Sequence, residues 1–420
     1  MGNLFTSRTG RPLSAATQPL LTVPEISAQP TLTNAILNGQ SKNLSVTASG
    51  GSLTYQWYEG LTGDTASPVG GAVSATYAAN PTAPKFYWCR VTNPLGSVDS
   101  NSCLLYVWPA ITGSIRTVNA GATATPDVMF MGINLGNAST GHVTLSAAVA
   151  AASAGDAIVY TGAITDTAAV TINKNLRVYV ADGFRHDGTQ AGAGATITNT
   201  STNTIFVTSG CTVEVVGLRV RNTSAGATAV YAADNSTVFR LIGCVVDKSN
   251  TFQGAGTNGF FASTGIQLIG CVVYADSTCM RVNSAGGAAD NYCWNVTIHG
   301  QGACDDGYAN YSGGGTYFSL NGCIATGSFS GQAFDNNAAF KAGSSHNHGG
   351  ANAPGTGSTT DPVADADYMV DATDGAADAH CVSRAQFVLY PGPTPVAAKA
   401  LDINLSAHVE AYAGAHYVAP

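Results

Sequence analysis

Charged side chains are scarce in this sequence. Lys, Arg, Asp and Glu together make up 10% of its 420 residues, and Glu occurs only at positions 25, 59, 214 and 410. A disordered chain would carry more charge and fewer apolar residues, so the composition predicts a folded protein. The formal net charge is −8, and no basic patch is visible. We therefore expect neither nucleic acid nor an anionic membrane as a partner, because phosphate binding needs clustered Lys and Arg.

The sequence also lacks signals for membrane insertion and export. No apolar run is long enough to span a bilayer, and the first residues do not combine a charged start with an apolar stretch. The ten cysteines form no CxxC pair and no Cys/His zinc spacing, so we expect neither a metal nor another cofactor. Ten cysteines without an export signal favour synthesis in a reducing cytoplasm.

Glycine and small or β-branched residues are what the sequence has in abundance. Its 49 Gly residues stand among many Ala, Thr, Ser, Asn and Val residues. Because Gly and Asn readily adopt the positive φ angles of tight turns, this composition predicts a rigid all-β protein. The chain is long enough for two or three separate cores.

A short motif recurs from about residue 205 onward. Each copy is a strand, a Gly or Asn, and a second strand, as in Leu241–Val246 and Leu268–Val273. The Gly or Asn stands at 217, 243, 270, 295 and 322, so successive spacings are 26, 27, 25 and 27 residues. A period in the twenties without a heptad or helix-pair pattern predicts a solenoid of about six coils, with one coil per repeat.

The residue that follows each of these Gly or Asn positions is apolar or Cys, which indicates the inside of a coil. Neighbouring strands lie about 4.8 Å apart, so equivalent small side chains can pack on one another along the stack. We expect these cysteines to be buried, reduced and inert. The five positions are Leu218, Cys244, Cys271, Val296 and Cys323.

The stretch from Leu145 to Ile164 predicts a cap for the open end of this solenoid. It contains an Ala-rich helix, which we expect Gly155 to stop, and a strand that ends at Gly162. With the Gly-Cys-x-Val repeats, it resembles the pectin-lyase-like right-handed parallel β-helix proteins, in which a short N-terminal helix closes the open end. The tail from Thr360 to Tyr417 resembles that family's closing segment. The resemblance covers about residues 142–420, and the fold it implies carries lyases, hydrolases, tailspikes and structural proteins.

The region before the solenoid predicts a separate β-sandwich. Short alternating strands at regular intervals are divided by Gly, Pro and Asn. It resembles immunoglobulin-like domains of the bacterial and phage kind, because Trp57 stands at the core Trp position and Tyr87 lies two residues before Cys89, as in a tyrosine corner. Val46 stands where the family's first Cys would be, so we expect no disulfide to Cys89.

The predicted fold class is all-β: an immunoglobulin-like β-sandwich followed by a short right-handed parallel β-helix with an N-terminal capping helix. We expect Met129–Met131, in the linker, to pack against the open end of the helix. The predicted parts are an extended arm at 1–22, the sandwich at 23–108, a linker at 109–141, the β-helix at 142–342, and a loop with the closing segment at 343–420.

Few residues offer catalytic chemistry. Polysaccharide hydrolysis uses two carboxylates in one groove, and the best pair here is Asp305 and Asp306. Neighbouring residues of a strand point to opposite faces, so this pair serves one groove only in a turn. Tyr308 and Tyr311 are candidate sugar-binding residues, with core packing as the alternative. A pair of histidines, His346 and His348, makes a poor metal site because a third ligand is missing.

The sequence therefore favours a structural and adhesive protein over an enzyme. A surface protein without export signals fits a bacteriophage virion part, such as a head fibre, decoration protein or tail appendage, made in the host cytoplasm. Its expected partners are other capsid or tail proteins, a host-surface polysaccharide, and copies of itself, with a trimer as one arrangement. The alternative function is a tailspike-like polysaccharide hydrolase or lyase, with Asp305 and Asp306 as its catalytic residues.

Overall fold

The structure is a computed structural model, and its chain divides into two compact units. The first comprises Met1–Thr31, Asn43–Ala79 and Phe86–Cys103, and the second comprises Leu32–Lys42, Asn80–Lys85 and Leu104–Pro420. The predicted arm and the predicted closing segment lie almost wholly outside the described residues. The structure describes residues 21–138, 140–186, 194–200, 202–208, 210–223, 228–232, 237–248, 260–262, 266–275, 280–282, 291–310 and 318–335, and the single residues 340, 344, 347, 349 and 353.

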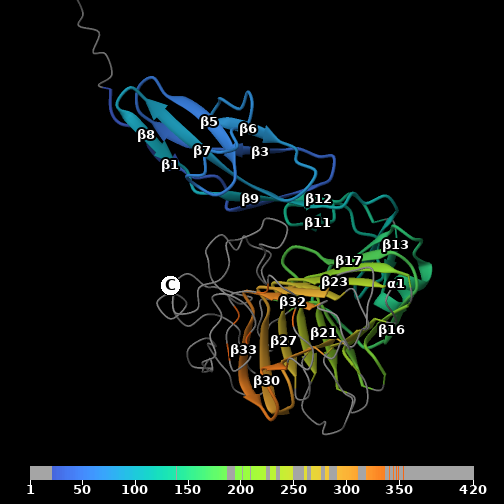
Figure 1. The fold of residues 1–420 in the computed structure, drawn as a ribbon. Coiled ribbons are helices and arrows are strands. Elements are labelled where there is room, and N and C mark those ends of the chain that lie inside the picture. The colour runs from blue at the N-terminus through green and yellow to red at the C-terminus, as the bar shows by residue number, and fades with distance from the viewer. Residues whose placement is uncertain are drawn as a thin grey trace, which may run out of the picture. The chain divides into compact units, whose positions relative to one another are not determined.

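The first unit is built from short antiparallel strands, as the alternating sequence predicted (Figure 1). Its longest pairing joins two strands so that Trp57 lies opposite Cys89. The strands of this part of the chain are β1 (Glu25–Ala28), which pairs with β4 (Thr47–Ser49), β3 (Lys42–Ser45), which pairs with β6 (Thr76–Ala79), and β5 (Thr54–Glu59), β7 (Lys85–Asn93) and β8 (Gly96–Asp99), which pair in that order.

The two aromatic residues predicted for the core of this unit lie there. Trp57 is fully buried, and its Nε1 donates a hydrogen bond to the Ser74 carbonyl at 2.9 Å. Tyr87 is also buried, and the ring of Tyr77 lies between the two, with centroids 6.2 Å from Trp57 and 5.7 Å from Tyr87. Cys89 is buried and forms no disulfide.

The second unit is dominated by three parallel sheets. The chain visits the sheets in turn, so that each pass adds one strand to each of them, and Figure 1 shows β21, β27, β30 and β33 of one sheet side by side. The first sheet runs in the order β13 (Thr140–His142), β10 (Ile115–Val118), β14 (Ala157–Tyr160), β17 (Leu176–Val180), β20 (Thr212–Val216), β23 (Val238–Ile242), β26 (Ile266–Ile269), β29 (Asn291–Trp294) and β32 (Phe318–Asn321).

The second and third sheets have seven strands each within the described residues, one more than the six coils expected. The extra pass, β14 to β16, precedes the recurring motif. The second sheet is β15 (Thr165–Asp166), β18 (Thr196–Asn199), β21 (Arg219–Asn222), β24 (Val245–Lys248), β27 (Val272–Ala275), β30 (Thr297–Cys304) and β33 (Ile324–Phe329). The third is β16 (Val170–Ile172), β19 (Ile205–Val207), β22 (Val230–Ala232), β25 (Phe260–Ala262), β28 (Met280–Val282), β31 (Tyr308–Asn310) and β34 (Phe334–Asp335).

Outside these sheets the second unit has two further strand pairs. β2 (Thr33–Leu37) and β9 (Cys103–Trp108) are parallel, and β11 (Met129–Phe130) and β12 (Ile133–Asn134) are antiparallel. The helix of the described residues, α1 (Leu145–Ala151), has seven residues, and nothing helical among them is long and apolar enough to cross a membrane.

The recurring Gly or Asn forms the corner between the first and second sheets. All five of these residues have left-handed φ angles: 76° at Gly217, 56° at Gly243, 58° at Gly270, 52° at Asn295 and 63° at Gly322. Their backbones form a ladder, in which the N–H groups of Gly217, Gly243, Gly270 and Asn295 donate to carbonyls of the next pass, as from Gly270 to Trp294 at 2.9 Å. The predicted period therefore reflects one left-handed corner per pass, where Gly and Asn are favoured.

The residues after the corners lie inside the stack, as predicted. Leu218, Cys244, Cys271, Val296 and Cys323 are fully buried in one hydrophobic core. No cysteine among the described residues forms a disulfide. The Cys271 thiol donates to two carbonyls of its surroundings, Leu241 and Ile269, both at 3.4 Å. Burial raises the pKa of the Cys323 thiol to about 12, so it is not a reactive thiolate at neutral pH.

Helix α1 buries its apolar side against this core, so the predicted Ala-rich helix is present. Leu145, Ala148 and Val149 are part of the core, and Thr144 accepts a hydrogen bond from the Ala147 amide as the N-cap residue. The predicted stop at Gly155 is wrong by a few residues. Ala152 is already extended, and Gly155, with φ of 90°, belongs to the turn that leads into β14.

Polar side chains cover the backbone edge of the last strand of the first sheet. The Asn347 Oδ1 accepts from the Cys323 amide at 3.0 Å, and its Nδ2 donates to the Leu320 carbonyl at 2.9 Å. The Ser344 hydroxyl accepts from the Leu320 amide at 3.1 Å. A free edge strand can pair with another chain, so these bonds protect the end of the sheet.

The corner geometry predicts that Gly270→Ala destabilises the protein by about 1–2 kcal/mol, because Ala resists a left-handed φ. Gly270→Asn should cost less, since Asn295 already occupies the equivalent corner. Gly162→Ala is the matched control: its φ is ordinary and its nearest new contact, Ile164 Cγ2, is 3.5 Å away. Urea unfolding measures all three, and equal effects of the two Ala variants would contradict the role of the corner.

Candidate functional site

The two carboxylates predicted as a catalytic pair both lie next to Gly331 but differ in exposure. Asp305 and Asp306 follow β30, but Asp305 is exposed whereas Asp306 is 5% exposed. Asp306 Oδ1 accepts from the Gln332 amide at 2.9 Å, and Asp305 Oδ1 accepts from the Ser330 hydroxyl at 3.4 Å. Both carboxylates therefore hold the neighbouring 330–332 turn.

Tyr308 lies in the core and not on the surface. Its side chain is fully buried, its ring stacks on Phe334 with centroids 5.1 Å apart, and its hydroxyl donates to the Val296 carbonyl at 2.9 Å. This is the packing alternative, and it leaves no ring face for a sugar. The other predicted sugar-binding residue, Tyr311, lies outside the described residues, as do His346 and His348.

A different aromatic pair is accessible on the outer face of the third sheet. Phe206 of β19 and Tyr231 of β22 are register partners, and their rings stack with centroids 5.4 Å apart at 22°. Both are partly exposed, whereas their strand neighbours Ile205, Val207 and Val230 are fully buried. The alternation within Ile205–Val207 and within the next coil was the available signal, because it places residues 206 and 231 on the outside.

A row of polar side chains follows the outer face of the first sheet. Arg177, Glu214, Arg240, Gln267 and Tyr292 occupy consecutive register positions. Arg240 donates to Glu214 Oε2 at 3.1 Å and to Gln267 Oε1 at 2.9 Å, and the Tyr292 hydroxyl donates to the same Gln267 oxygen at 3.0 Å. These side chains form a ladder that runs across the coils.

An aromatic residue of the first sheet, Tyr179, lies beside this ladder and is covered by the rings of two other residues. Tyr179, fully buried, packs against Trp108 at 5.9 Å and stacks on Phe130 at 4.5 Å. Burial raises the pKa of Tyr179, and its hydroxyl donates to Glu214 Oε1 at 3.2 Å. The expectation that Met129–Met131 packs against the open end is therefore wrong for Phe130, which covers the outer face of the first sheet.

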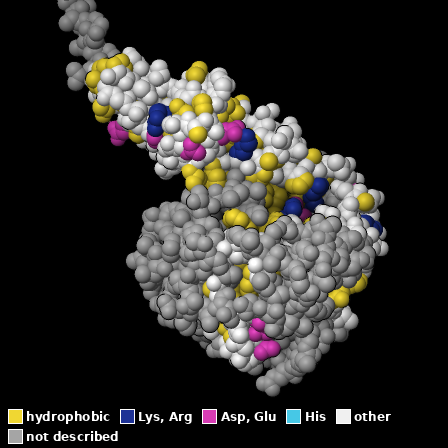
Figure 2. All heavy atoms as spheres, in the orientation of Figure 1, with side chains coloured by type: hydrophobic (Ala, Val, Ile, Leu, Met, Phe, Trp, Pro, Cys, Tyr) yellow, Lys and Arg dark blue, Asp and Glu magenta, His cyan; other side chains and the backbone are white. Residues whose placement is uncertain are grey.

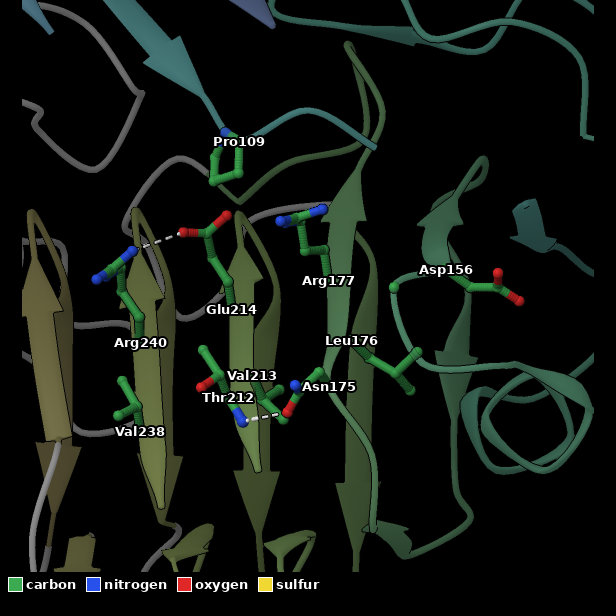
Figure 3. A pocket seen from close by; sticks show the side chains of 11 residues that line it. Pro109, Asp156, Asn175, Leu176, Arg177, Thr212, Val213, Glu214, Val238 and Arg240 are labelled. Carbon is green, nitrogen blue, oxygen red and sulfur yellow. Dashed lines mark hydrogen bonds and ion pairs between the residues drawn. The ribbon is translucent and has the colours of Figure 1, made fainter. Parts of the chain in front are cut away.

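A pocket opens beside the ladder, with a cavity volume of about 190 Å³. Figure 3 shows its floor as two rows of side chains from three strands and the dashed Glu214–Arg240 ion pair. The charged row is Arg177, Glu214 and Arg240, and the other row is Asn175, Thr212 and Val238. The remaining lining residues are Pro109, Gly155, Asp156, Leu176 and Val213.

Asp156, at the edge of this pocket, is held by several donors. Its Oδ1 accepts from the Ser114 amide at 2.7 Å, and its Oδ2 accepts from the Ser153 amide at 2.9 Å and from Arg116 Nε at 3.0 Å. Burial by itself raises the pKa of Asp156. The two amides and Arg116 lower it by more, so the pKa lies below its ordinary value of 3.8.

The second sheet carries a buried row of polar side chains on its outer face. Asp247, Tyr274, His299 and Thr326 occupy consecutive register positions, and each is at most 4% exposed. Asp247 Oδ2 accepts from Arg219 at 2.5 Å. Figure 2 shows one face of the molecule, on which the charged side chains of the described residues are few and scattered. The described residues contain no group of three His, Cys, Asp or Glu that could hold a metal.

Comparison with known proteins gives structural similarity only. No protein-family model and no curated protein matches the chain. Similar solved structures include Sidekick-1 immunoglobulin domains 1–5, with 18% identity and a TM-score of 0.18 over 26% of this chain and 24% of that one. The N-terminal four immunoglobulin domains of Dscam1 isoform 1.9 match with 14% identity and a TM-score of 0.17, over 25% and 31%.

A three-immunoglobulin-domain structure of titin, an E-to-A mutated variant, matches with 13% identity and a TM-score of 0.17, over 24% of this chain and 40% of that one. The chain thus covers between 24% and 40% of these structures' own lengths. The molecule is an all-β protein with parallel sheets and immunoglobulin-domain structural neighbours. TM-scores this low carry no argument about function.

The bonds to Asp156 predict an acid-sensitive contribution to stability. A carboxylate with a lowered pKa stabilises the folded state above its ordinary pKa, and this stabilisation is lost as the pH falls through the folded value. Asp156→Asn should therefore lower the free energy of unfolding at neutral pH by about 1–3 kcal/mol and flatten its fall below pH 3.8. Arg116→Gln should keep part of that slope, because the two amides remain. Urea unfolding across the acid range measures this, and an unchanged slope in Asp156→Asn would count against it.

Proposed function

We propose that residues 142–342 form a right-handed parallel β-helix of the pectin-lyase-like kind, preceded by an immunoglobulin-like domain of the bacterial and phage kind. Three parallel sheets visited in turn, one left-handed corner per pass and a helix over the first coils support this proposal. The antiparallel strands around Trp57 and the missing disulfide at Cys89 support the second part.

On this architecture we base a structural and adhesive function: a bacteriophage virion surface protein, such as a head fibre, decoration protein or tail appendage, that contacts host glycans. The observation that supports it best is the stacked pair Phe206–Tyr231, partly exposed on the outside of a rigid sheet. Aromatic rings offer flat apolar faces with a negative π surface, which suit the C–H faces of sugar rings.

The pairing of carboxylates with arginines also favours an adhesive function over a catalytic one. Glu214 is paired with Arg240, Asp247 with Arg219, and Asp156 with Arg116. Catalysis on a glycosidic bond needs an acid and a base that both reach the substrate. Among the described residues these paired carboxylates serve the fold, which favours binding over cleavage.

The cysteines of the described residues are buried and form no disulfide, which supports assembly in a reducing host cytoplasm, with the virion as the final location. Other capsid or tail proteins are the proposed partners, together with further copies of this chain, and a trimer is one arrangement. Parallel stacks of this kind have flat lateral faces that can meet one another.

The alternative is a tailspike-like polysaccharide hydrolase or lyase. Two observations keep it open: Asp305 is exposed next to Asp306, and Asp247, Tyr274 and His299 stand in line on the second sheet. Ionisable groups gathered in one place are a common property of catalytic sites.

The adhesive function predicts that Phe206→Ala and Tyr231→Ala each weaken binding to a host-surface polysaccharide by about three- to tenfold, the effect of one aromatic contact. Tyr231→Phe keeps the ring and should retain most of the binding. Tyr55→Ala, which removes a partly buried aromatic ring from the first unit, serves as the matched control. Unchanged binding in both Ala variants would exclude this pair as the adhesive surface.

The virion assignment has a separate test. Mass spectrometry of gradient-purified phage particles should detect this chain at a fixed ratio to the major capsid or tail protein. Detection only in the lysate supernatant would contradict a structural role in the virion.

A further inference from the structure

The pocket on the first sheet has the composition of a small polar binding site. Its charged row contains two guanidinium groups, Arg177 and Arg240, on either side of Glu214 (Figure 3). Both oxygens of Glu214 are already bonded, Oε1 to the Tyr179 hydroxyl and Oε2 to Arg240. Glu214 and Arg240 therefore neutralise each other.

Arg177 adds a positive charge that this pair does not balance. Its Nη1 donates to the Ala110 carbonyl at 2.9 Å, and within the described residues no ion pair engages its guanidinium. Arg177 is partly exposed. A guanidinium carries five N–H donors in a planar fork that matches a carboxylate, so most of its donors stay available to a ligand.

The second row supplies neutral hydrogen-bonding groups that line the same pocket as the charged row. Asn175 Oδ1 accepts from the Thr212 amide at 2.8 Å. This bond fixes the Asn175 side chain with its NH2 group turned away from the Thr212 amide. Thr212 itself is an exposed residue. Val238 and Pro109 add apolar surface at two sides of the pocket. Together these groups suit a ring that carries hydroxyls on its edge and C–H bonds on its face.

The size of the cavity limits the ligand. At about 190 Å³ it is smaller than the roughly 300–1,000 Å³ of pockets for drug-sized ligands. Adjacent strands lie about 4.8 Å apart, so three strands span roughly 10 Å, the width of one sugar ring with its substituents. The pocket therefore accommodates one monosaccharide unit and not an extended chain.

We propose that this pocket binds one acidic sugar unit of a glycan, a hexuronate, with its carboxylate on Arg177 and its ring hydroxyls on Asn175 and Thr212. This inference rests on the proposed adhesion to glycans and names the sugar class that a second contact, on another sheet than Phe206 and Tyr231, would select. Val238 and Pro109 contact the apolar side of the ring.

Isothermal titration of the full chain with glucuronate, with glucose as the neutral analogue and with inorganic sulfate as a plain anion, tests the proposal. We expect glucuronate to bind at least about tenfold more tightly than glucose or sulfate, because only it satisfies both rows of the floor. Arg177→Gln should lose about tenfold or more of the glucuronate affinity, and Arg177→Lys should lose less than Gln but not restore it, since an ammonium lacks the fork. Thr212→Val should weaken both sugars.

Lys42→Gln is the matched control, because it removes one positive charge from an exposed side chain that is no part of the pocket. It should leave the affinity unchanged. Equal binding of glucose and glucuronate, binding of sulfate as tight as that of glucuronate, or an unchanged affinity in Arg177→Gln would each overturn the proposal. If the polysaccharide still binds through Phe206 and Tyr231, only this inference fails. If glucuronate binds at Arg177 but no polysaccharide is retained, the adhesive function is wrong and the hexuronate site of the pocket is supported.

Discussion

The structure of the second unit depends on one constraint, the in-register stacking of parallel strands. Each pass of the chain must place its corner directly beside the previous corner, so that the backbone N–H groups of one coil meet the carbonyls of the next. The corner itself is left-handed, which is why Gly or Asn recurs there. Inward side chains then stack on their equivalents, and only small or well-shaped residues such as Cys244 and Val296 fit.

The same register also arranges the outward-facing side chains of the three sheets. A side chain one period away lies on the neighbouring strand, so outward residues form rows along the stack. One row is an ion-paired ladder, one is an apolar strip under Phe130 and Trp108, and one is the aromatic pair of the third sheet. At the first and last strands of the described residues, other groups contact the stack. Helix α1 packs its apolar side on the core, and the side chains of Ser344 and Asn347 bond to backbone groups of Leu320 and Cys323 beside β32.

Local features of the sequence were sufficient to predict much of this fold. The recurring Gly or Asn, the interior cysteines and the Ala-rich helix can be recognised from short stretches of sequence, and the structure has all of them. The side-chain pairs that join different passes of the chain were harder to predict. Glu214 and Arg240 lie 26 residues apart, one repeat, so their pairing could have been read from the period. The inward direction of Tyr308 and the outward position of Phe130 depend on tertiary packing. The contacts of Asn347 reach back over 24 and 27 residues to a strand edge, which no local pattern reveals.

The central claim is that this protein holds a glycan without cutting it. The most direct test incubates the folded chain with a panel of host-surface polysaccharides and measures retention of the polymer and release of reducing ends in the same sample. The account predicts retention of at least one polysaccharide with no increase in reducing ends. Release by the wild type that disappears in the double variant Asp305→Ala/Asp306→Ala would contradict it and make this protein an enzyme.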